Sequence, residues 1–271
     1  MSLPSPSSED TILITGASAG IGTELARQLA QRGHALVLVA RRRERLDELA
    51  EELRQAHGTD VEVHPCVLAD DAARGALIET LLQGDKHVAG VCNNAGYGSF
   101  GRFWELPRES ETNMVRLNCV AVVELTHAFL PAMVERGEGS ILEVASMASF
   151  QPTPWNSTYS ATKAFVLSFS EGVSAELAGT GVSLTVLCPG PVNTEFSDVA
   201  GVAELHSGLP DLFTQSAEEV AEAGIDGMIR GKRTVFTGLP HRLIAQAGRL
   251  TPRSALLPVM NLIGSRTLER R

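Results

Sequence analysis

The sequence predicts an α/β fold, a single doubly wound parallel sheet with helices on both faces. Three observations predict it. A short apolar run at residues 11–14 leads into a glycine-rich turn and then a helix with apolar residues at helical spacing. Further apolar runs alternate with amphipathic helical segments as far as Thr237. No linker or internal repeat interrupts this alternation, and parallel strands require helical crossovers of this kind.

Composition narrows the class of protein. The chain has 271 residues, 44% hydrophobic and 20% charged, which is typical of a globular protein with ample material for a core. A net charge of -9 argues against nucleic acid as a partner. The four cysteines lack C-x-x-C spacing and lie in apolar runs, which indicates buried free thiols and predicts neither a disulfide nor a metal site.

The N-terminal residues 1–10 are rich in proline and serine and are expected to be flexible. They lack the charged-then-apolar pattern of a secretory signal. No apolar run approaches the ~18 residues of a membrane span. We therefore expect a cytoplasmic protein.

The glycine-rich turn at residues 15–22 predicts a phosphate-binding site. It lies between a strand and a helix, so the N–H groups at the helix start and the helix dipole favour a phosphate there. Glycines let the backbone turn tightly and approach a ligand closely. This context favours a dinucleotide over a simple turn. The residues expected to contact it are Gly16, Ser18, Gly20, Ile21 and Gly22.

The second strand, residues 35–39, predicts which dinucleotide binds. Folds that prefer NAD often carry an acid at the end of this strand, where it binds the ribose 2′-OH. This chain has Ala40 followed by Arg41, Arg42 and Arg43. Guanidinium groups bind a phosphate and no carboxylate repels it, so we predict NADP(H), held by Arg41 with help from Arg42. The alternative, arginines that only begin a solvated helix at residues 42–55, fits Arg43 and one of its neighbours.

Two more strands are expected at residues 61–67 and 87–92, with a helix at 70–82 between them. The second of these strands ends in the run Asn93, Asn94, Ala95 and Gly96, small and amide residues that again allow close approach to a ligand. We expect a second cofactor contact there.

A long helix is expected over residues 108–136, and Pro131 should bend or end its main run. Asn118 lies in the middle of this helix. Asparagine is a weak helix former, which indicates a packing or water-holding role for Asn118.

Strands at residues 140–144 and 182–187 complete most of the sheet, followed by a helix at 217–229 and a last strand at 234–237. Ser146 lies just past the first of these strands. Ligands of open parallel sheets bind outside the carboxyl ends of strands, so Ser146 is placed to contact a substrate oxygen, although such a serine is often only a turn residue. Residues 193–210 lack periodicity and are a candidate substrate lid.

Tyr159 and Lys163 are four residues apart at the start of a helical pattern, so their side chains share one helix face. A cation near a phenol favours the phenolate and lowers its pKa. A tyrosine so tuned can serve as general acid or base at an alcohol or carbonyl oxygen. The spacing alone is common, and its weight comes from the other motifs.

These motifs occur in the order and spacing of the short-chain dehydrogenase/reductase family, which the sequence resembles from Thr11 to Gly238. They are T-G-x-x-x-G-I-G at 15–22, N-N-A-G at 93–96, Asn118, Ser146, Y-x-x-x-K at 159–163, and Pro189-Gly190 with Thr194 after it. The resemblance implies a Rossmann-like fold of seven parallel strands. It also implies a catalytic tetrad of Asn118, Ser146, Tyr159 and Lys163.

By the same resemblance, Tyr159 exchanges the proton, Lys163 lowers its pKa and binds the nicotinamide ribose, Ser146 orients the substrate, and Asn118 holds a water behind Lys163. The cofactor contacts it implies, beyond those of the glycine-rich turn and the arginines, are Asn94, Ala95, Gly96, Tyr159, Lys163, Pro189, Gly190, Val192 and Thr194. One position departs from the family, since Val67 stands where an Asp usually contacts the adenine. Asp70 follows three residues later, so either this contact is lost or the register differs.

The tail, residues 239–271, departs from the common family pattern and combines arginines with apolar residues. It is an extension of the same domain in our reading, so that residues 11–238 form the main body. The tail could lie weakly on a membrane surface, dock on another subunit, or cover the substrate site. The resemblance implies a homodimer or homotetramer built on the long helices that carry Asn118 and Tyr159.

Two functions fit the sequence. The first is an NADP(H)-dependent oxidoreductase that interconverts a secondary alcohol and a ketone, with an apolar small molecule as its substrate. The second is a sensor or scaffold protein that binds NADP and has lost its chemistry. All four residues of the tetrad are present, which favours the enzyme.

Overall fold

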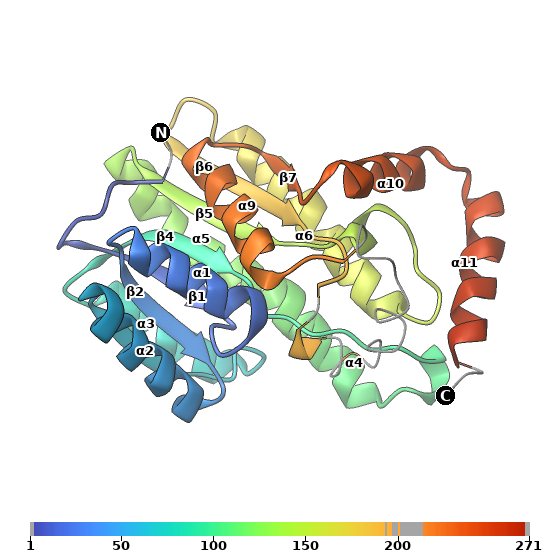
Figure 1. Cartoon of the computed structure of the whole chain (residues 1–271), viewed down its shortest axis with the longest axis horizontal. Coiled ribbons are helices and arrows are strands. Elements are labelled where there is room, and N and C mark those ends of the chain that lie inside the picture. Colours follow the sequence, from blue (N-terminus) through green and yellow to red (C-terminus); the bar gives the residue numbers. More distant parts are fainter. Residues whose placement is uncertain (1–2, 193, 197–199, 201–213, 269–271) are drawn as a thin grey trace.

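Seven parallel strands form one sheet in the order β3-β2-β1-β4-β5-β6-β7 (Figure 1). The computed structural model describes residues 3–192, 194–196, 200 and 214–268. The strands are β1 (Asp10–Thr15), β2 (Ala35–Ala40), β3 (Val61–Pro65), β4 (His87–Asn93), β5 (Gly139–Val144), β6 (Val182–Cys188) and β7 (Thr234–Phe236).

Helices connect the strands and continue beyond the last one, which confirms the predicted α/β fold with its C-terminal helical extension. The α-helices are α1 (Gly20–Gln31), α2 (Arg43–His57), α3 (Asp71–Leu82), α4 (Arg108–Val115), α5 (Ala121–Arg136), α6 (Ser157–Glu176), α9 (Ala217–Ile229), α10 (Leu239–Leu250) and α11 (Arg253–Leu268). Shorter helical turns are η1 (Phe103–Glu105), the π-helical η2 (Arg116–Val120) and η3 (Met147–Phe150).

Buried side chains on both faces of the sheet hold these helices in place. In β1, Ile12 and Ile14 belong to one buried cluster, with residues of α1, α2 and α9, whereas Leu13 belongs to a second, with residues of α3 and α5. Successive residues of a strand point to opposite faces, so an unbroken apolar run such as this one supplies both cores. Full burial of a leucine or isoleucine side chain contributes roughly 1.5–3 kcal/mol.

The order of the strands reverses at β1, whose neighbours are β2 on one side and β4 on the other. The chain builds the sheet outward from β1 to β3, then returns to the far side of β1 and continues to β7. In such sheets the loops at the reversal point diverge and leave a crevice at the carboxyl ends of the strands. The glycine-rich turn after β1 and the loop after β4 therefore meet at this crevice.

The long predicted helix is continuous over Arg108–Arg136 but contains a π-helical turn. Ala121 donates its backbone N–H to Arg116 O, five residues back, and Asn118 lies within this turn. Pro131 does not end α5, which runs on to Arg136 and stops at Gly137, a residue in the left-handed conformation. By length and composition this stretch could span a membrane, but a core helix of a soluble protein meets the same test. Its buried residues, such as Leu125 and Phe129, pack in the core.

The tail forms two helices, and α10 packs against the main body. Ala245 is buried in a cluster with Phe150 and Val166, and Arg249 lies 5.8 Å from the centre of the Phe150 ring. His241 is buried between Thr237 and Gly190. Helix α11 stands at the edge of the molecule, to the right in Figure 1. Near the other end of the chain, Leu3 is buried and Asp10 begins β1.

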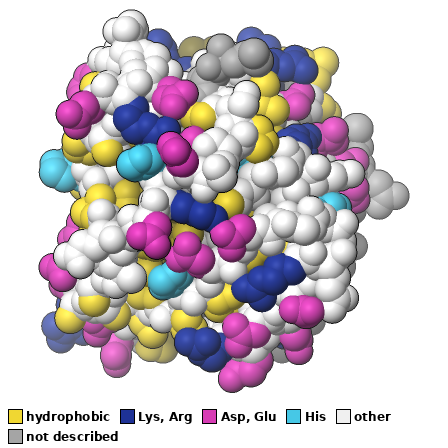
Figure 2. Space-filling model, turned by 90° about the vertical axis from the view of Figure 1, so that its left-hand side faces the viewer, with side chains coloured by type: hydrophobic (Ala, Val, Ile, Leu, Met, Phe, Trp, Pro, Cys, Tyr) yellow, Lys and Arg dark blue, Asp and Glu magenta, His cyan; other side chains and the backbone are white. Residues whose placement is uncertain are grey.

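The four cysteines are buried free thiols, as predicted. Burial raises the pKa of the Cys119 thiol to about 11 and that of Cys188 to about 12, so both stay protonated near neutral pH. The face turned away from α11 mixes Lys and Arg with Asp and Glu side chains, so neither sign dominates it among the described residues (Figure 2).

The packing of α10 can be tested with a matched pair of substitutions. Ala245→Asp places a carboxylate in the buried cluster and is expected to lower the free energy of unfolding by roughly 3 kcal/mol or more. Leu243→Asp makes the same kind of change on the same helix at a side chain that is 61% exposed, so its cost should stay below about 1 kcal/mol. Urea unfolding of both variants measures the difference. Equal losses would mean that α10 does not depend on this contact.

Candidate functional site

The loops after β1 and β4 are bonded to each other at the crevice. Thr15 Oγ1 accepts hydrogen bonds from the backbone N–H groups of Asn94 and Ala95, both at 3.0 Å. The Asn94 side chain donates in return to Thr15 O at 2.9 Å. The predicted second contact region at residues 94–96 thus lies beside the glycine-rich turn. The Asn94 amide holds the two loops together, which is a structural role besides any contact with a ligand.

The start of α1 is suited to bind phosphate. Its N-cap, Ala19, has no side-chain acceptor, and the first turn has no acidic residue, so no carboxylate or hydroxyl of the helix's own first turn caps its N–H groups. Gly22 allows the helix to approach the turn closely, because a Cβ at this position would lie 2.2 Å from Gly16 O. Exposed N–H groups and the helix dipole favour an anion at such a helix start.

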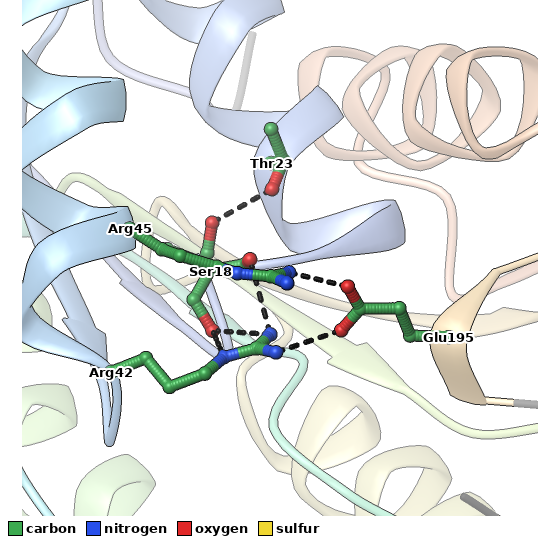
Figure 3. A network of polar contacts seen from close by, with 6 residues as sticks. Ser18, Thr23, Arg42, Arg45 and Glu195 are labelled. Carbon is green, nitrogen blue, oxygen red and sulfur yellow. Dashed lines mark hydrogen bonds and ion pairs between the residues drawn. The ribbon is translucent and has the colours of Figure 1, made fainter. Parts of the chain in front are cut away.

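An arginine pair stands beside this turn, at the start of α2 (Figure 3). Arg42 donates to Ser18 O and Ser18 Oγ, both at 3.2 Å, and its Nη1 lies 2.9 Å from Glu195 Oε2. Arg45 also pairs with Glu195, through the other carboxylate oxygen. Arg45 and Glu195 line an open hollow of about 330 Å³ together with Gly20 and Thr194.

The sequence assigned the leading role in phosphate binding to Arg41, and the geometry places other arginines nearer the turn. Arg41 is exposed, and its side chain makes no hydrogen bond or ion pair with any described residue. Arg43 is solvated beside Asp47, as the alternative interpretation expected. Arg45 was missed. The signal available was its spacing, because residue 45 lies one turn after Arg42 on a helix and shares its face.

Val67 and Asp70 are the two positions that the sequence left open for the adenine contact. Strand β3 ends at Pro65, two residues earlier than predicted, and Val67 is 50% exposed beyond it. Asp70 is the N-cap of α3, and its side chain accepts the Ala73 N–H at 2.8 Å. Capping of α3 is therefore sufficient to explain an aspartate at residue 70.

Tyr159, Lys163 and Ser146 meet at the carboxyl end of β5. Tyr159 and Lys163 are buried on one face of α6, with the ammonium 5.9 Å from the centre of the phenol ring. Lys163 Nζ donates to Val144 O at 2.7 Å, which ties α6 to the last residue of β5. Ser146, two residues on, accepts the Ala148 N–H at 3.1 Å and begins η3. The sequence thus predicted correctly that these three residues lie together.

The pKa shifts at this site differ from the sequence prediction. Burial raises the pKa of Tyr159 to about 12, and hydrogen bonding to Ser146 opposes the rise. Burial also lowers the pKa of Lys163 to about 8, against the attraction of neighbouring groups that include Glu143. We expected Lys163 to lower the pKa of the phenol, but loss of water around the buried phenol is the larger effect. At neutral pH Tyr159 is a protonated phenol and Lys163 an ammonium.

Asn118 lies next to Lys163, and its side chain is bonded to the neighbouring loop and helix. The Asn118 amide donates to Tyr97 O and to Thr162 Oγ1, both at 3.0 Å, and its Oδ1 accepts the Tyr97 N–H at 3.3 Å. A Cβ on Gly96 would lie 3.1 Å from Asn118 Oδ1 and 3.4 Å from Lys163 Nζ, so the loop after β4 passes directly over both residues. The side chain therefore fixes the loop, both of its amide hydrogens are used, and one lone pair of Oδ1 is left to accept from a water.

The loop after β6 runs along the same end of the sheet. The backbone N–H of Gly190 lies 3.4 Å from Thr237 Oγ1, and Pro189 O accepts the Met147 N–H at 2.9 Å. Val192 is buried, and Thr194 lies against Gly20 of the glycine-rich turn. Phe196 packs 5.4 Å from the ring of Tyr159. Most of the predicted lid at residues 193–210 lies outside the described residues.

A buried carboxyl beneath the site was not predicted. Glu143 Oε1 on β5 accepts from Asn93 Nδ2 at 2.9 Å and from Thr126 Oγ1 at 2.8 Å. Burial raises the pKa of Glu143 to about 8, although these hydrogen bonds and Lys163 favour its ionised form. The sequence offered one signal, an acid within the apolar run of a central strand. Buried acids are rare unless they are paired.

Comparison with known proteins identifies the family. The family model of short chain dehydrogenase matches residues 10–203. Sulfoacetaldehyde reductase 2 of Chromohalobacter salexigens is 38% identical over 220 residues, which cover 79% of this chain and 86% of that protein. The chain belongs to the short-chain dehydrogenase/reductase family, and it is an oxidoreductase of that family.

Solved structures of this family share the fold and hold either cofactor. A short-chain dehydrogenase from Sphingobium yanoikuyae in complex with NADPH has a TM-score of 0.79 and 34% identity, covering 92% of this chain and 95% of that one. A short-chain dehydrogenase/reductase from Burkholderia phymatum in complex with NAD has a TM-score of 0.78 and 25% identity, covering 89% and 93%. Binding of a nicotinamide dinucleotide is common to both.

The buried Glu143 should make stability depend on pH. The folded protein holds this proton up to about pH 8, whereas the unfolded chain releases it near the ordinary value of 4.5. The folded state then binds more protons between these values, so stability should fall as pH rises, by at most about 1.4 kcal/mol per pH unit. Urea unfolding from pH 5.5 to 8 measures this slope.

In Glu143→Gln the slope should become shallower, because the amide cannot ionise. Glu51→Gln, at an exposed position on α2, is the matched control and should keep the slope of the wild type. If Glu143→Gln and wild type had parallel curves, Glu143 would be ionised in the folded protein.

Proposed function

We propose that this oxidoreductase uses NADP(H) to interconvert a secondary alcohol and a ketone, with carbonyl reduction of an apolar substrate as its reaction. The observation that carries the proposal is the buried Tyr159 phenol, hydrogen-bonded to Ser146 and adjacent to Lys163 at the carboxyl end of the sheet. A protonated phenol in this position can donate to a carbonyl oxygen that gains negative charge.

The chain offers a binding site for the whole length of a dinucleotide. The uncapped start of α1 fits the pyrophosphate, with Gly16, Ser18, Gly20, Ile21 and Gly22 around it. Arg42, with Arg45 beside it, is in reach of a 2′-phosphate, and Arg41 is retained as a weaker candidate. The remaining contacts we propose are those of Asn94, Ala95, Gly96, Tyr159, Lys163, Pro189, Gly190, Val192 and Thr194.

Bound NADPH would supply the hydride for reduction. Tyr159 donates its phenolic proton to the developing alkoxide, and Ser146 holds the same oxygen by a hydrogen bond. Lys163, fixed by Val144 O, keeps a positive charge beside the phenol and stabilises the phenolate that remains. Asn118 positions the loop at Gly96 and the neighbouring Lys163. Exclusion of water by the surrounding packing strengthens each of these interactions.

Aromatic side chains beside the phenol favour an apolar substrate. Phe196 packs against the Tyr159 ring, and a Cβ on Gly98 would lie 3.2 Å from both rings, so little space separates them from the loop after β4. The loop before α6 is held by Trp155, whose indole N–H lies 3.1 Å from Asn261 Oδ1 of α11. Helix α11 thus supports the loop before α6 on the substrate side of the site. The tail then belongs to the same domain as residues 11–238.

The proposal extends to assembly and location. Eight large apolar side chains of α10 and α11 are at least 39% exposed, an apolar surface of the kind that partners cover. They are Leu239, Leu243, Ile244, Leu250, Leu257, Val259, Leu262 and Ile263. We propose a cytoplasmic homodimer or homotetramer, with a weak membrane-surface contact of the tail as the alternative use of this surface.

Removing the phenolic hydroxyl tests the role of Tyr159. Tyr159→Phe should lower kcat by roughly 10²- to 10⁴-fold, because the proton donor is lost, while the Kd for NADPH changes little. The chain contains one other tyrosine, Tyr97, whose hydroxyl bonds to Ser110 O. Tyr97→Phe is therefore the matched control and should retain most of the turnover. An unchanged kcat in Tyr159→Phe would remove Tyr159 from the mechanism.

Single substitutions can separate the contributions of Arg41 and Arg42 to cofactor binding. Arg42→Ala should weaken NADPH roughly 10- to 100-fold, since a charged hydrogen bond to phosphate contributes about 1.5–3 kcal/mol, and should leave NADH nearly unchanged. Nicotinamide fluorescence gives both constants. Arg41→Ala should have the smaller effect on NADPH. A larger loss of NADPH affinity in Arg41→Ala than in Arg42→Ala would assign the 2′-phosphate to Arg41. Equal losses for NADPH and NADH would reject a phosphate contact.

A further inference from the structure

Glu195 occupies the guanidinium groups that stand ready for the 2′-phosphate. Its carboxylate lies between Arg42 and Arg45 and accepts from both, one guanidinium to each oxygen (Figure 3). The arginines come from the start of α2, whereas Glu195 follows β6 by seven residues, so the bridge joins two distant parts of the sequence across the glycine-rich turn. We call this arrangement the Glu195 bridge.

The Glu195 bridge uses the same chemistry as a phosphate contact. Arg42 already donates through Nε and Nη2 to Ser18, so its Nη1, which faces Glu195, is the outward donor. Arg45 directs Nη1 at the same carboxylate. An anionic ligand placed between these two side chains would need the positions that the carboxylate oxygens hold, because both groups bind the planar fork of a guanidinium.

We propose that Glu195 is a specificity-determining residue that competes with the 2′-phosphate of NADP(H) for Arg42 and Arg45 and so reduces the preference of the site for the phosphorylated cofactor. This inference rests on the proposed use of NADP(H). A phosphate and the carboxylate cannot both lie between the arginines without repulsion, so the phosphate must displace Glu195. NADH carries no 2′-phosphate and does not have to break the bridge.

The exposure of the groups fits displacement. The side chains of Glu195, Arg42 and Arg45 are 44%, 42% and 46% exposed, so the carboxylate can turn into solvent without leaving a buried charge behind. The two arginines, Arg45 first, hold the pKa of Glu195 below its ordinary value, so the competing group stays ionised near neutral pH. Exposed ion pairs are weak, and a ligand can break them at modest cost.

The size of the effect on NADPH affinity depends on the fraction of protein in which the Glu195 bridge is open. A ligand that binds only the open arrangement loses apparent affinity in proportion to the fraction of protein that is open. Breaking two exposed ion pairs to one carboxylate should lower the apparent affinity for NADPH roughly three- to tenfold. This loss falls on NADPH alone.

The experiment compares Glu195→Gln with wild type in the full chain, using nicotinamide fluorescence to obtain Kd for NADPH and for NADH at fixed ionic strength. Glu195→Gln keeps the shape of the side chain and removes its charge. We expect NADPH to bind roughly three- to tenfold more tightly and NADH to change less than about twofold. An unchanged or weaker Kd for NADPH would overturn the inference, because Glu195 would then be neutral or would help to orient the arginines.

A matched control separates competition from a general change of charge. Glu24 lines the same hollow but pairs with Arg27, and no hydrogen bond or ion pair joins it to Arg42 or Arg45 among the described residues. Glu24→Gln removes the same charge and should leave both constants nearly unchanged. If it tightened NADPH as much as Glu195→Gln does, or if Glu195→Gln tightened NADH equally, competition at the arginines would be rejected.

A third variant tests the route of the effect. In an Arg45→Ala background half of the Glu195 bridge is gone, so Glu195→Gln should give a smaller gain in NADPH affinity than it gives in wild type. The same gain in both backgrounds would overturn the bridge as the cause.

The outcomes also distinguish this inference from the proposed function. Wild type that prefers NADPH, with no gain in Glu195→Gln, leaves the proposed function standing and removes the inference. Wild type without a preference, in which Glu195→Gln creates one, supports the competition and corrects the proposed cofactor. Binding of neither dinucleotide, by wild type or variant, overturns both.

Discussion

The hydrogen bonds between Thr15 and the backbone of Asn94 and Ala95 hold together the two loops on which the site is built. They exist because β1 and β4 are neighbours in the sheet and both loops leave it at the same edge. One hydroxyl thus couples the turn suited to a phosphate with the loop that passes over Asn118 and Lys163.

The protonation of the side chains at the far end of the crevice depends more on their burial than on their charged neighbours. Tyr159, Lys163 and Glu143 are all buried, and loss of water disfavours the charged form of each. Near neutral pH the phenol keeps its proton, and Lys163 keeps its charge although burial lowers its pKa to about 8. A hydrogen bond from Lys163 to Val144 O holds the ammonium at β5, where the nearby Glu143 carboxyl favours its charged form.

Much of the fold could be predicted from the sequence, because each strand is a short apolar run and each helix has its own apolar face. Local patterns also predicted that Tyr159, Lys163 and Ser146 lie together. Other features depend on contacts between distant residues. No local pattern links Glu195 to Arg42 and Arg45, or places Glu143 against Asn93 and Thr126. Burial, which sets the pKa of Tyr159, is likewise a property of the packed protein, and the sequence prediction considered only the nearby cation.

The errors at element ends have local causes. Strand β3 ends at Pro65 because its partner β2 ends at Ala40, which pairs with Pro65 and accepts the Cys66 N–H as the last bond between them. Pro131 lies inside α5, where its missing N–H costs one hydrogen bond but does not stop a helix held by Leu125, Phe129 and Met133 in the core.

The π-helical turn at Asn118 divides the long helix into two stretches of different phase. One additional residue in a helical turn advances every later side chain by about 100° around the axis. The buried side chains before and after the turn therefore face different neighbours, and α4 packs against α6 whereas α5 packs against β4 and β5. A single helical wheel drawn through residues 108–136 would place Met114 and Leu125 on one stripe, although the two side chains pack against different neighbours.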